Sequence, residues 1–181
     1  LAKYEPRVLP GVSSLSYMCS AVGQAWNDAE VISAHGRSIN IASEVRRNKK
    51  TFILTDGNIS TLLHTLQEYR FGCLPVYIGE RLSYPEETIV SGTVDELADG
   101  EYDKLAVMLV INEKADERIL AGIADEKFER GNVPMTKREV RAVTMSALKI
   151  QPESIVYDIG AGTGSVSIEA AMAAYRGTVY G

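Results

Sequence analysis

The sequence contains few of the residues that mark specialised classes of protein. Its 181 residues include two cysteines, two histidines and one tryptophan. Cys19 and Cys73 cannot build a disulfide framework, which indicates a reducing compartment, and we expect a cytoplasmic protein. Neither His35 nor His64 has a second histidine or a cysteine at ligand spacing, so we expect no bound metal.

Two further absences exclude whole classes of partner. No apolar run reaches the roughly 18–20 residues of a membrane span. Lys3, Glu5 and Arg7 interrupt any apolar core of a signal peptide. The formal net charge of -5 argues against a general nucleic-acid binder, whose surface would be basic. We therefore expect neither a membrane nor a nucleic-acid partner.

What remains is the composition of an ordinary globular protein, with 45% hydrophobic and 24% charged residues. Strand and helix signals alternate over the first 112 residues, which predicts an α/β fold with a mixed sheet. Helical periodicity covers residues 14–22, 41–47 and 59–66, and strand patterns cover residues 30–34, 51–55, 74–78, 88–90 and 104–111. The last of these strands is apolar throughout, so we expect both of its faces to be covered.

Residues 113–130 are crowded with charges and have few apolar anchors, which favours a linker. A second domain then begins at residue 131. Thr136 followed by Glu139 matches a capping box, and Val140, Val143 and Ala147 predict the buried face of the helix that follows it.

The rest of the second domain reads as strand, turn, helix and strand. Residues 154–157 and 178–180 are the strands, and Ile168, Ala171, Met172 and Tyr175 predict the buried face of the helix between them. This order is the opening of a parallel, Rossmann-like sheet, of which residues 131–181 contain only the first part. The chain therefore resembles a piece of a longer protein, cut at both ends.

The strongest local motif is Asp158-Ile-Gly-Ala-Gly-Thr-Gly164, between a predicted strand and a predicted helix. Glycines at alternate positions let a ligand approach the backbone, and the helix start behind them offers free N–H groups. A nicotinamide-binding fingerprint requires glycine at position 165, where this chain has Ser165. A nicotinamide-dependent reductase nevertheless stays an alternative, as does a glycine-rich turn without a ligand.

This motif resembles the first motif of class I S-adenosylmethionine-dependent methyltransferases. The resemblance implies that the carboxylate of Asp158 faces the ammonium group of the cofactor and that the glycines pack under its methionyl-ribosyl part. The implied S-adenosylmethionine-binding residues are Asp158, Gly160, Ala161, Gly162, Thr163 and Gly164.

Residues 134–141 and 122–128 are similar to the entry of the decarboxylating precorrin methyltransferases. The resemblance implies a cofactor contact at Thr136, which could equally be a helix cap. Lys137, Arg138 and Arg141 are candidates for binding substrate carboxylates, because arginine and lysine pair with such groups. The alternative is that they belong to a solvated helix face.

The first domain separately resembles the C-terminal half of the tetrapyrrole (corrin/porphyrin) methylases. The resemblance rests on residues 10–14, 33–37, 54–56, 75–76 and 80–85, in the order of that family. It implies cofactor contacts at Ser13, Ser14, Leu54 and Leu82, for which helix capping and core packing are the alternatives. His35 and Arg37 follow a strand end, where ligands gather in α/β sheets, and are candidates for substrate contact.

Together the two resemblances imply a fused methyltransferase of cobalamin biosynthesis. Such an enzyme uses S-adenosylmethionine to methylate two bridging carbons of a precorrin and removes carbon dioxide from an acetate side chain. The resemblance also implies a homo-oligomer in the intact protein. No residue pattern indicates a nucleophile with its base, so we assign no catalytic residue. A catalytically inactive tetrapyrrole-binding fragment is the remaining alternative.

Overall fold

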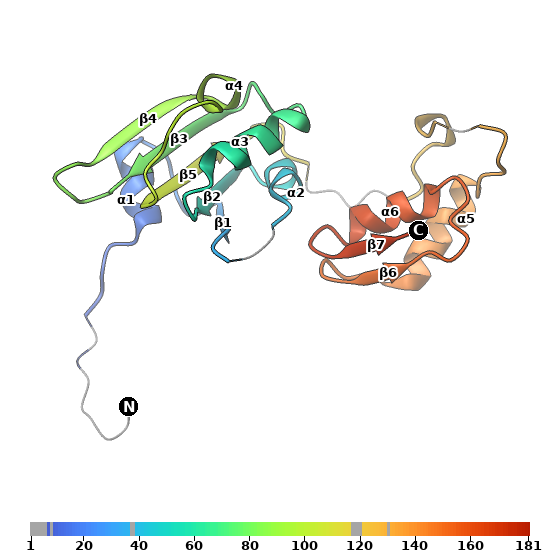
Figure 1. Cartoon of the computed structure of the whole chain (residues 1–181). Coiled ribbons are helices and arrows are strands. Elements are labelled where there is room, and N and C mark those ends of the chain that lie inside the picture. Colours follow the sequence, from blue (N-terminus) through green and yellow to red (C-terminus); the bar gives the residue numbers. More distant parts are fainter. Residues whose placement is uncertain (1–6, 8, 37–38, 117–120, 130) are drawn as a thin grey trace. The chain divides into compact units, whose positions relative to one another are not determined.

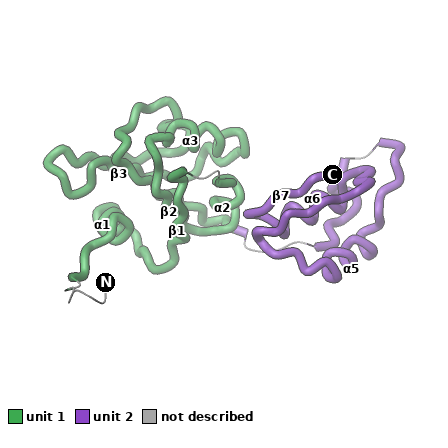
Figure 2. The backbone as a smooth tube through the Cα atoms, turned by 60° about the horizontal axis from the view of Figure 1, so that its bottom comes forward, with its two compact units in different colours: residues 1–115 green, residues 116–181 purple. Residues whose placement is uncertain are grey.

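The computed structural model describes residues 7, 9–36, 39–116, 121–129 and 131–181 (Figure 1). The chain divides into two compact units, Leu1–Ala115 and Asp116–Gly181 (Figure 2). Unit 1 contains two clusters of buried apolar side chains, and unit 2 contains one.

Unit 1 is built on a five-stranded mixed sheet with the order β1-β2-β5-β3-β4. β1 and β2 are parallel, and the other three pairings are antiparallel. The strands are β1 (Ala29–Ser33), β2 (Lys50–Leu54), β3 (Pro75–Glu80), β4 (Thr88–Thr93) and β5 (Ala106–Ile111). The predicted strands are thereby confirmed, and the apolar β5 lies at the centre of the sheet.

Helices cover both faces of this sheet. α2 (Ile41–Arg47), α3 (Ile59–Glu68) and α4 (Val94–Leu97) pack on one face, and α1 (Ser14–Ala21) packs on the other (Figure 1). β5 sends Met108 into the α3 side and Leu109 into the α1 side, as strand alternation requires. The prediction that both faces of this strand are covered is confirmed.

One helix of unit 1 has no counterpart among the predictions. α4 has four residues, too few to show a helical period, and is defined by its cap. The Thr93 side chain accepts the Glu96 N–H, and the Glu96 carboxylate accepts the Thr93 N–H in return.

Unit 2 contains two parallel strands and two helices on one face of them. β6 (Ile155–Tyr157) pairs with β7 (Thr178–Tyr180), which confirms the predicted parallel pairing. α5 (Arg138–Leu148) and α6 (Ser165–Ala173) meet the strands at Met145, Ala170 and Ala173, and a short 3-10 turn, η1 (Asp125–Lys127), precedes them. On the opposite face Tyr157 and Tyr180 stack with ring centroids 5.1 Å apart and remain exposed.

The predicted capping box of α5 is wrong. The N-cap residue is Lys137 rather than Thr136, and no side chain caps the first turn. Thr136 has a different structural role: its carbonyl oxygen accepts a hydrogen bond from the guanidinium of Arg141.

The predicted buried faces of α5 and α6 are also wrong. Val140 and Val143 are 55% and 70% exposed, and Ile168 is 47% exposed. α5 instead buries Arg141 and Met145, and α6 buries Ser165, Glu169, Ala170 and Ala173. The physical reason is a charged pair, Arg141 and Glu169, that occupies the interface between these helices. A hydrophobic pattern cannot indicate such a face.

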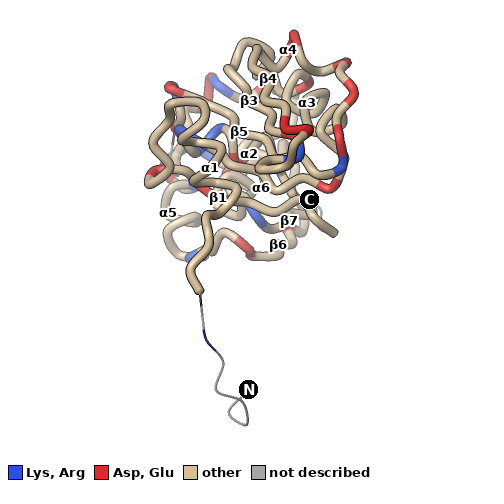
Figure 3. Tube along the Cα trace, turned by 90° about the vertical axis from the view of Figure 1, so that its left-hand side faces the viewer, with Lys and Arg blue, Asp and Glu red and all other residues tan. Residues whose placement is uncertain are grey.

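Charges of both signs are interspersed along the trace (Figure 3). Within the described ranges, no helix is long and apolar enough to cross a membrane.

We expect the stability of unit 1 to fall as the pH drops below about 4. Hydrogen bonds from the Leu105 N–H and from Arg81, each 2.7 Å long, lower the pKa of Asp103. The Thr93 N–H lowers the pKa of Glu96 in the same way. Such a carboxyl stabilises the fold above its unfolded pKa, and this contribution is lost as the pH falls through the folded pKa.

The check is the urea midpoint of unit 1 measured between pH 7 and pH 3. Asp103→Asn should flatten the acid limb of this profile, and Glu68→Gln, at an exposed carboxylate of α3, should retain the wild-type limb. Identical acid limbs for Asp103→Asn and wild type would contradict the assignment.

Candidate functional site

The glycine-rich turn between β6 and α6 is an open loop of backbone. Gly160, Gly162 and Gly164 have φ angles of 83°, 59° and 70°, in the left-handed region that favours glycine. A Cβ atom built on Gly160 or Gly164 would meet no atom within 4 Å. The glycines therefore do not serve close packing within the chain, and their open sides can accept a ligand.

The start of α6 faces this turn, and no side chain among the described residues caps its first backbone N–H groups. Gly164 is the N-cap residue, and it has no side chain to satisfy the first N–H groups of the helix. Ala161 and Thr163 lie between the glycines and are half-buried. From Gly160 to Gly164 the turn thus presents N–H groups and only small side chains, with the exposed Ile159 just before it, and such a stretch suits a polar or anionic group.

Asp158 stands at the end of β6, directly before the turn. Its backbone N–H donates to the Tyr180 carbonyl (2.7 Å), and its Oδ2 accepts the Ser167 hydroxyl (2.6 Å). Its Oδ1 has no hydrogen-bond partner in the part of the chain that the structure describes. This half-buried carboxylate can therefore accept from a cationic ligand group.

The segment that carries Thr136 runs beside this turn. Val133 Cγ1 lies 4.0 Å from the Cβ position of Gly162. Thr136 and Lys137 are exposed, and the Lys137 ammonium lies 4.0 Å from Asp125. The side chains of Thr136 and Lys137 thus lie at the surface, where a ligand can reach them.

Arg141 requires a correction. The sequence assigns it to substrate binding, but its side chain is fully buried. Its Nε donates to Glu169 Oε1 (2.8 Å) and its Nη1 to Asp125 Oδ1 (2.9 Å), and both terminal nitrogens also donate to the carbonyls of Thr136 and Ile123. A guanidinium held in this way is a structural group and offers no accessible donor to a substrate.

Glu169, which no sequence pattern indicated, completes this cluster. It is also fully buried and accepts the N–H groups of Gly122 (2.8 Å) and Ile123 (2.9 Å). Burial lowers the pKa of Arg141, but its hydrogen bonds to Glu169 and then Asp125 raise the pKa by more. The cluster fixes residues 122–125, which the sequence assigns to a linker, against α5 and α6.

In unit 1, Ser13 and Ser14 lie at the start of α1. Ser13 is the N-cap residue, and its hydroxyl accepts the Ser16 N–H (3.1 Å). The capping alternative is therefore confirmed for Ser13. Its side chain is exposed, so the structure also leaves it open to a ligand.

Leu54 and Leu82 lie on the same side of the sheet as α1. Leu54 follows Phe52 by two residues on β2, and Leu82 packs partly buried against the cluster around α1. Gly79 permits this approach, because a Cβ there would lie 2.7 Å from Met18 Sδ and 2.8 Å from Leu82 Cδ2. Leu54 and Leu82 thus lie on the face of the sheet that α1 covers, and Ser13 and Ser14 lie at the start of that helix.

Glu87 forms hydrogen bonds to both the loop that carries Leu82 and helix α1. Its Oε2 accepts the Ser83 N–H (2.6 Å), next to Leu82. A hydrogen bond between Glu87 and the hydroxyl of Tyr17, on α1, raises the pKa of Tyr17. Arg81 and Ser83 have φ angles of 48° and 70°, unusual for residues other than glycine, so the loop after β3 is held in a strained conformation.

His35 lies after β1, and Asp56 lies after the parallel neighbour β2. His35 Nδ1 is 3.2 Å from Asp56 Oδ1, and the side chains are 74% and 52% exposed. Asp56 was not among the predicted site residues, although its position directly after a strand end is a signal that sequence reasoning could have used. Arg37 lies outside the described residues.

No group of histidine, cysteine, aspartate and glutamate side chains within the described ranges could hold a metal ion.

Two family models match the chain, one after the other. The model of tetrapyrrole (corrin/porphyrin) methylases matches residues 1–98, and that of the precorrin methyltransferase domain matches residues 126–181. The two matches fall on unit 1 and on unit 2, respectively.

Similar proteins carry related names. The precorrin-6Y C(5,15)-methyltransferase [decarboxylating] of Sinorhizobium sp is 34% identical in an alignment of length 177 that covers 93% of this chain and 42% of the relative. The cobalt-precorrin-6B C(15)-methyltransferase (decarboxylating) of Salmonella typhimurium is 61% identical over 49 residues, 26% of each chain. The chain thus spans less than half the length of these curated relatives.

Solved structures resemble this chain more distantly. The crystal structure of the precorrin-6Y methylase from Archaeoglobus fulgidus has a TM-score of 0.40 and 19% sequence identity. It covers 56% of this chain, and the match spans 45% of the other.

Proposed function

This chain belongs to the tetrapyrrole (corrin/porphyrin) methylases, and on that premise we propose that the protein is a decarboxylating precorrin methyltransferase of cobalamin biosynthesis. It would methylate two bridging carbons of a precorrin from S-adenosylmethionine and release carbon dioxide from an acetate side chain. The observation that carries the proposal is the succession of the two matched families on one chain. The relative from Sinorhizobium, whose name includes both positions, aligns with 93% of the chain.

The open glycine turn of unit 2 fits S-adenosylmethionine. The free Oδ1 of Asp158 is suited to the ammonium group of the cofactor, and Gly160 and Gly164 leave space against the backbone. Ala161, Gly162 and Thr163 complete the turn, and Thr136 adds a hydroxyl from the segment beside it. In unit 1, Ser13, Ser14, Leu54 and Leu82 on the α1 face of the sheet are the candidates for a second cofactor site.

The bound cofactor would supply a methyl group that is already activated by the sulfonium charge. The protein then needs to align the methyl group with the substrate carbon and to exclude water, rather than to supply a nucleophile. This requirement agrees with the residues around the glycine turn, where backbone and one carboxylate dominate. His35, Arg37 and Lys137 are our candidates for contacts to the carboxylates of the macrocycle.

We expect Asp158→Ala to weaken S-adenosylhomocysteine binding at unit 2 by about 10- to 100-fold, the loss of one hydrogen bond to a charged group. The measurement is isothermal titration of the full encoded chain with S-adenosylhomocysteine and, separately, with NADH. Asp158→Asn retains an oxygen acceptor and should weaken binding less than Asp158→Ala.

The control is Asp99→Ala, which removes an aspartate that is 95% exposed in unit 1 and should leave both titrations unchanged. Tight binding of NADH without binding of S-adenosylhomocysteine would instead establish the nicotinamide alternative. Methylation of a precorrin by the full chain, with carbon dioxide release, is the direct test of the activity.

A further inference from the structure

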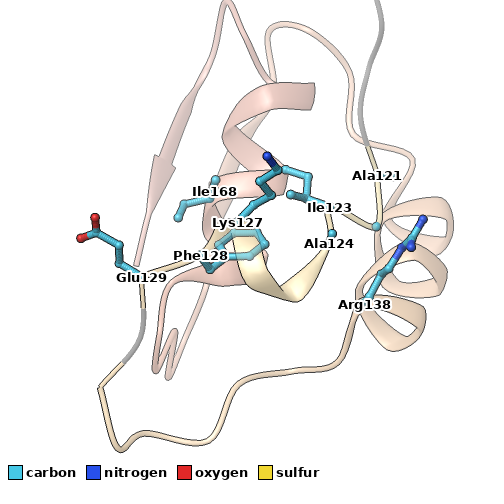
Figure 4. A pocket seen from close by; sticks show the side chains of 9 residues that line it. Ala121, Ile123, Ala124, Lys127, Phe128, Glu129, Arg138 and Ile168 are labelled. Atoms are coloured by element: carbon cyan, nitrogen blue, oxygen red, sulfur yellow. The ribbon is translucent and has the colours of Figure 1, made fainter.

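Unit 2 contains a cavity that is separate from the glycine turn. It has a volume of about 740 Å³ and lies between residues 121–129, the start of α5 and the first turns of α6 (Figure 4). Its volume is within the range of small-molecule sites, about 300–1,000 Å³. Ile123, Phe128 and Ile168 line it together with Lys127 and Arg138.

The backbone of residues 122 and 123, which forms one wall of this cavity, is held by hydrogen bonds to two buried side chains. The N–H groups of Gly122 and Ile123 donate to the buried Glu169, and the Ile123 carbonyl accepts from Arg141. These backbone groups are therefore satisfied on the side away from the cavity. Gly122 has φ +70°, and a Cβ there would lie 3.1 Å from Ala142, so this backbone can hardly move toward α5.

Phe128 gives the cavity an aromatic wall. The guanidinium carbon of Arg141 lies 4.6 Å from the centre of its ring. This cation is neutralised by Glu169 and Asp125, so it holds the ring without adding an accessible charge to the cavity. An apolar, planar ligand body would find a matching surface here.

The polar groups of the lining are mainly cationic. Neither Lys127 nor Arg138 has an ion-pair or hydrogen-bond partner within the described residues, and Glu129 is the one acidic side chain of the lining. Arg138 is the first residue of α5, whose uncapped N-terminus adds positive potential. Unpaired cations beside an apolar wall favour an organic anion.

We propose that this cavity binds the carboxylate-bearing edge of the tetrapyrrole substrate, with Lys127 and Arg138 as charge partners and Phe128 against the ring system. The class of substrate in this proposal rests on the proposed function. The location of the binding site rests on the residues that line the cavity. Of the arginines that the sequence analysis considers for carboxylate binding, the proposal retains Arg138, excludes the buried Arg141 and adds Lys127.

The test uses the full encoded chain and uroporphyrin, a tetrapyrrole whose side chains are all carboxylic acids, followed by its absorption band. Lys127→Met and Arg138→Met keep the aliphatic stems and remove the charges. Each should raise the Kd for uroporphyrin by about five- to tenfold, and Arg138→Lys should stay within about threefold of wild type. Lys114→Met, at an exposed lysine of unit 1, is the matched control and should stay within about twofold.

Titration with S-adenosylhomocysteine separates this proposal from the proposed function. If that cofactor product binds while the Lys127→Met/Arg138→Met double variant keeps the wild-type Kd for uroporphyrin, the cavity proposal is overturned and the function stands. Loss of uroporphyrin binding in His35→Ala, with a wild-type Kd in the Lys127→Met/Arg138→Met double variant, would place the macrocycle in unit 1 and would also overturn it. Full displacement of uroporphyrin by equimolar citrate would show a site for small carboxylates and contradict a tetrapyrrole occupant.

Discussion

Replacing Arg141 by methionine is expected to destabilise unit 2 by about 3–5 kcal/mol, the cost of leaving a buried charge without its partner. Glu169 would keep the N–H groups of Gly122 and Ile123 but lose the guanidinium that neutralises it. The carbonyls of Ile123 and Thr136 would lose a donor as well. The loss should therefore exceed that of an ordinary exposed ion pair, about 0–1 kcal/mol.

The measurement is the free energy of unfolding of unit 2 from a urea titration. Arg138→Met, which removes an exposed arginine three residues earlier on the same helix, should change this free energy by less than about 0.5 kcal/mol. Equal stabilities of the Arg141 and Arg138 variants would refute the structural role of the buried pair.

Gly177→Ala is expected to destabilise unit 2 by about 3 kcal/mol or more, because the added methyl group has no room. A Cβ at this position would lie 2.0 Å from the Ser154 carbonyl oxygen, which accepts the Thr178 N–H at the start of the β6–β7 pairing. Since the obstacle is backbone rather than a flexible side chain, relief requires the two strands to separate.

Gly160→Ala supplies the contrasting variant on the same unit. Its Cβ would meet nothing within 4 Å, so the expected cost is only that of a left-handed backbone, about 1–2 kcal/mol. Under the proposed function it should weaken S-adenosylhomocysteine binding although the fold survives. Thermal unfolding and titration of both variants give the comparison, and a Gly177 variant as stable as wild type would contradict the packing.

The sequence predicted unit 1 well, because its elements follow simple periodicities. The α3 stripe of Ile59, Leu62, Leu63 and Leu66 is fully buried as expected, and the apolar run of β5 does occupy the centre of the sheet. α4 was not predicted, since four residues carry a cap but no period.

In unit 2 hydrophobic periodicity also predicted the helices, but it assigned their buried faces wrongly. It treats charged residues as exposed, whereas Arg141 and Glu169 are fully buried and displace Val143 and Ile168 to the surface. Predicting these faces correctly requires knowing that Arg141 and Glu169 form an ion pair. The two residues are 28 positions apart in the sequence, so no local pattern indicates the pair.

The part of the candidate site that depends on backbone conformation was predicted from the sequence. The glycine turn lies between β6 and α6 as expected, with all three glycines at positive φ. Contacts that depend on tertiary structure could not be predicted. Asp56 meets His35 only because β1 and β2 are neighbours, and Phe128 meets Arg141 only because residues 122–125 fold back onto the helices.

The stacked pair Tyr157–Tyr180 also has an optical consequence. The single tryptophan of the sequence, Trp26, belongs to unit 1, whereas the aromatic chromophores of unit 2 are Phe128 and three tyrosines, two of them stacked. Indole emission excited at the red edge of absorption therefore reports on unit 1 alone. The other six tyrosines belong to unit 1, so the change in near-ultraviolet circular dichroism on Tyr157→Phe is the signal that isolates the coupled phenol rings and reports on the β6–β7 pairing.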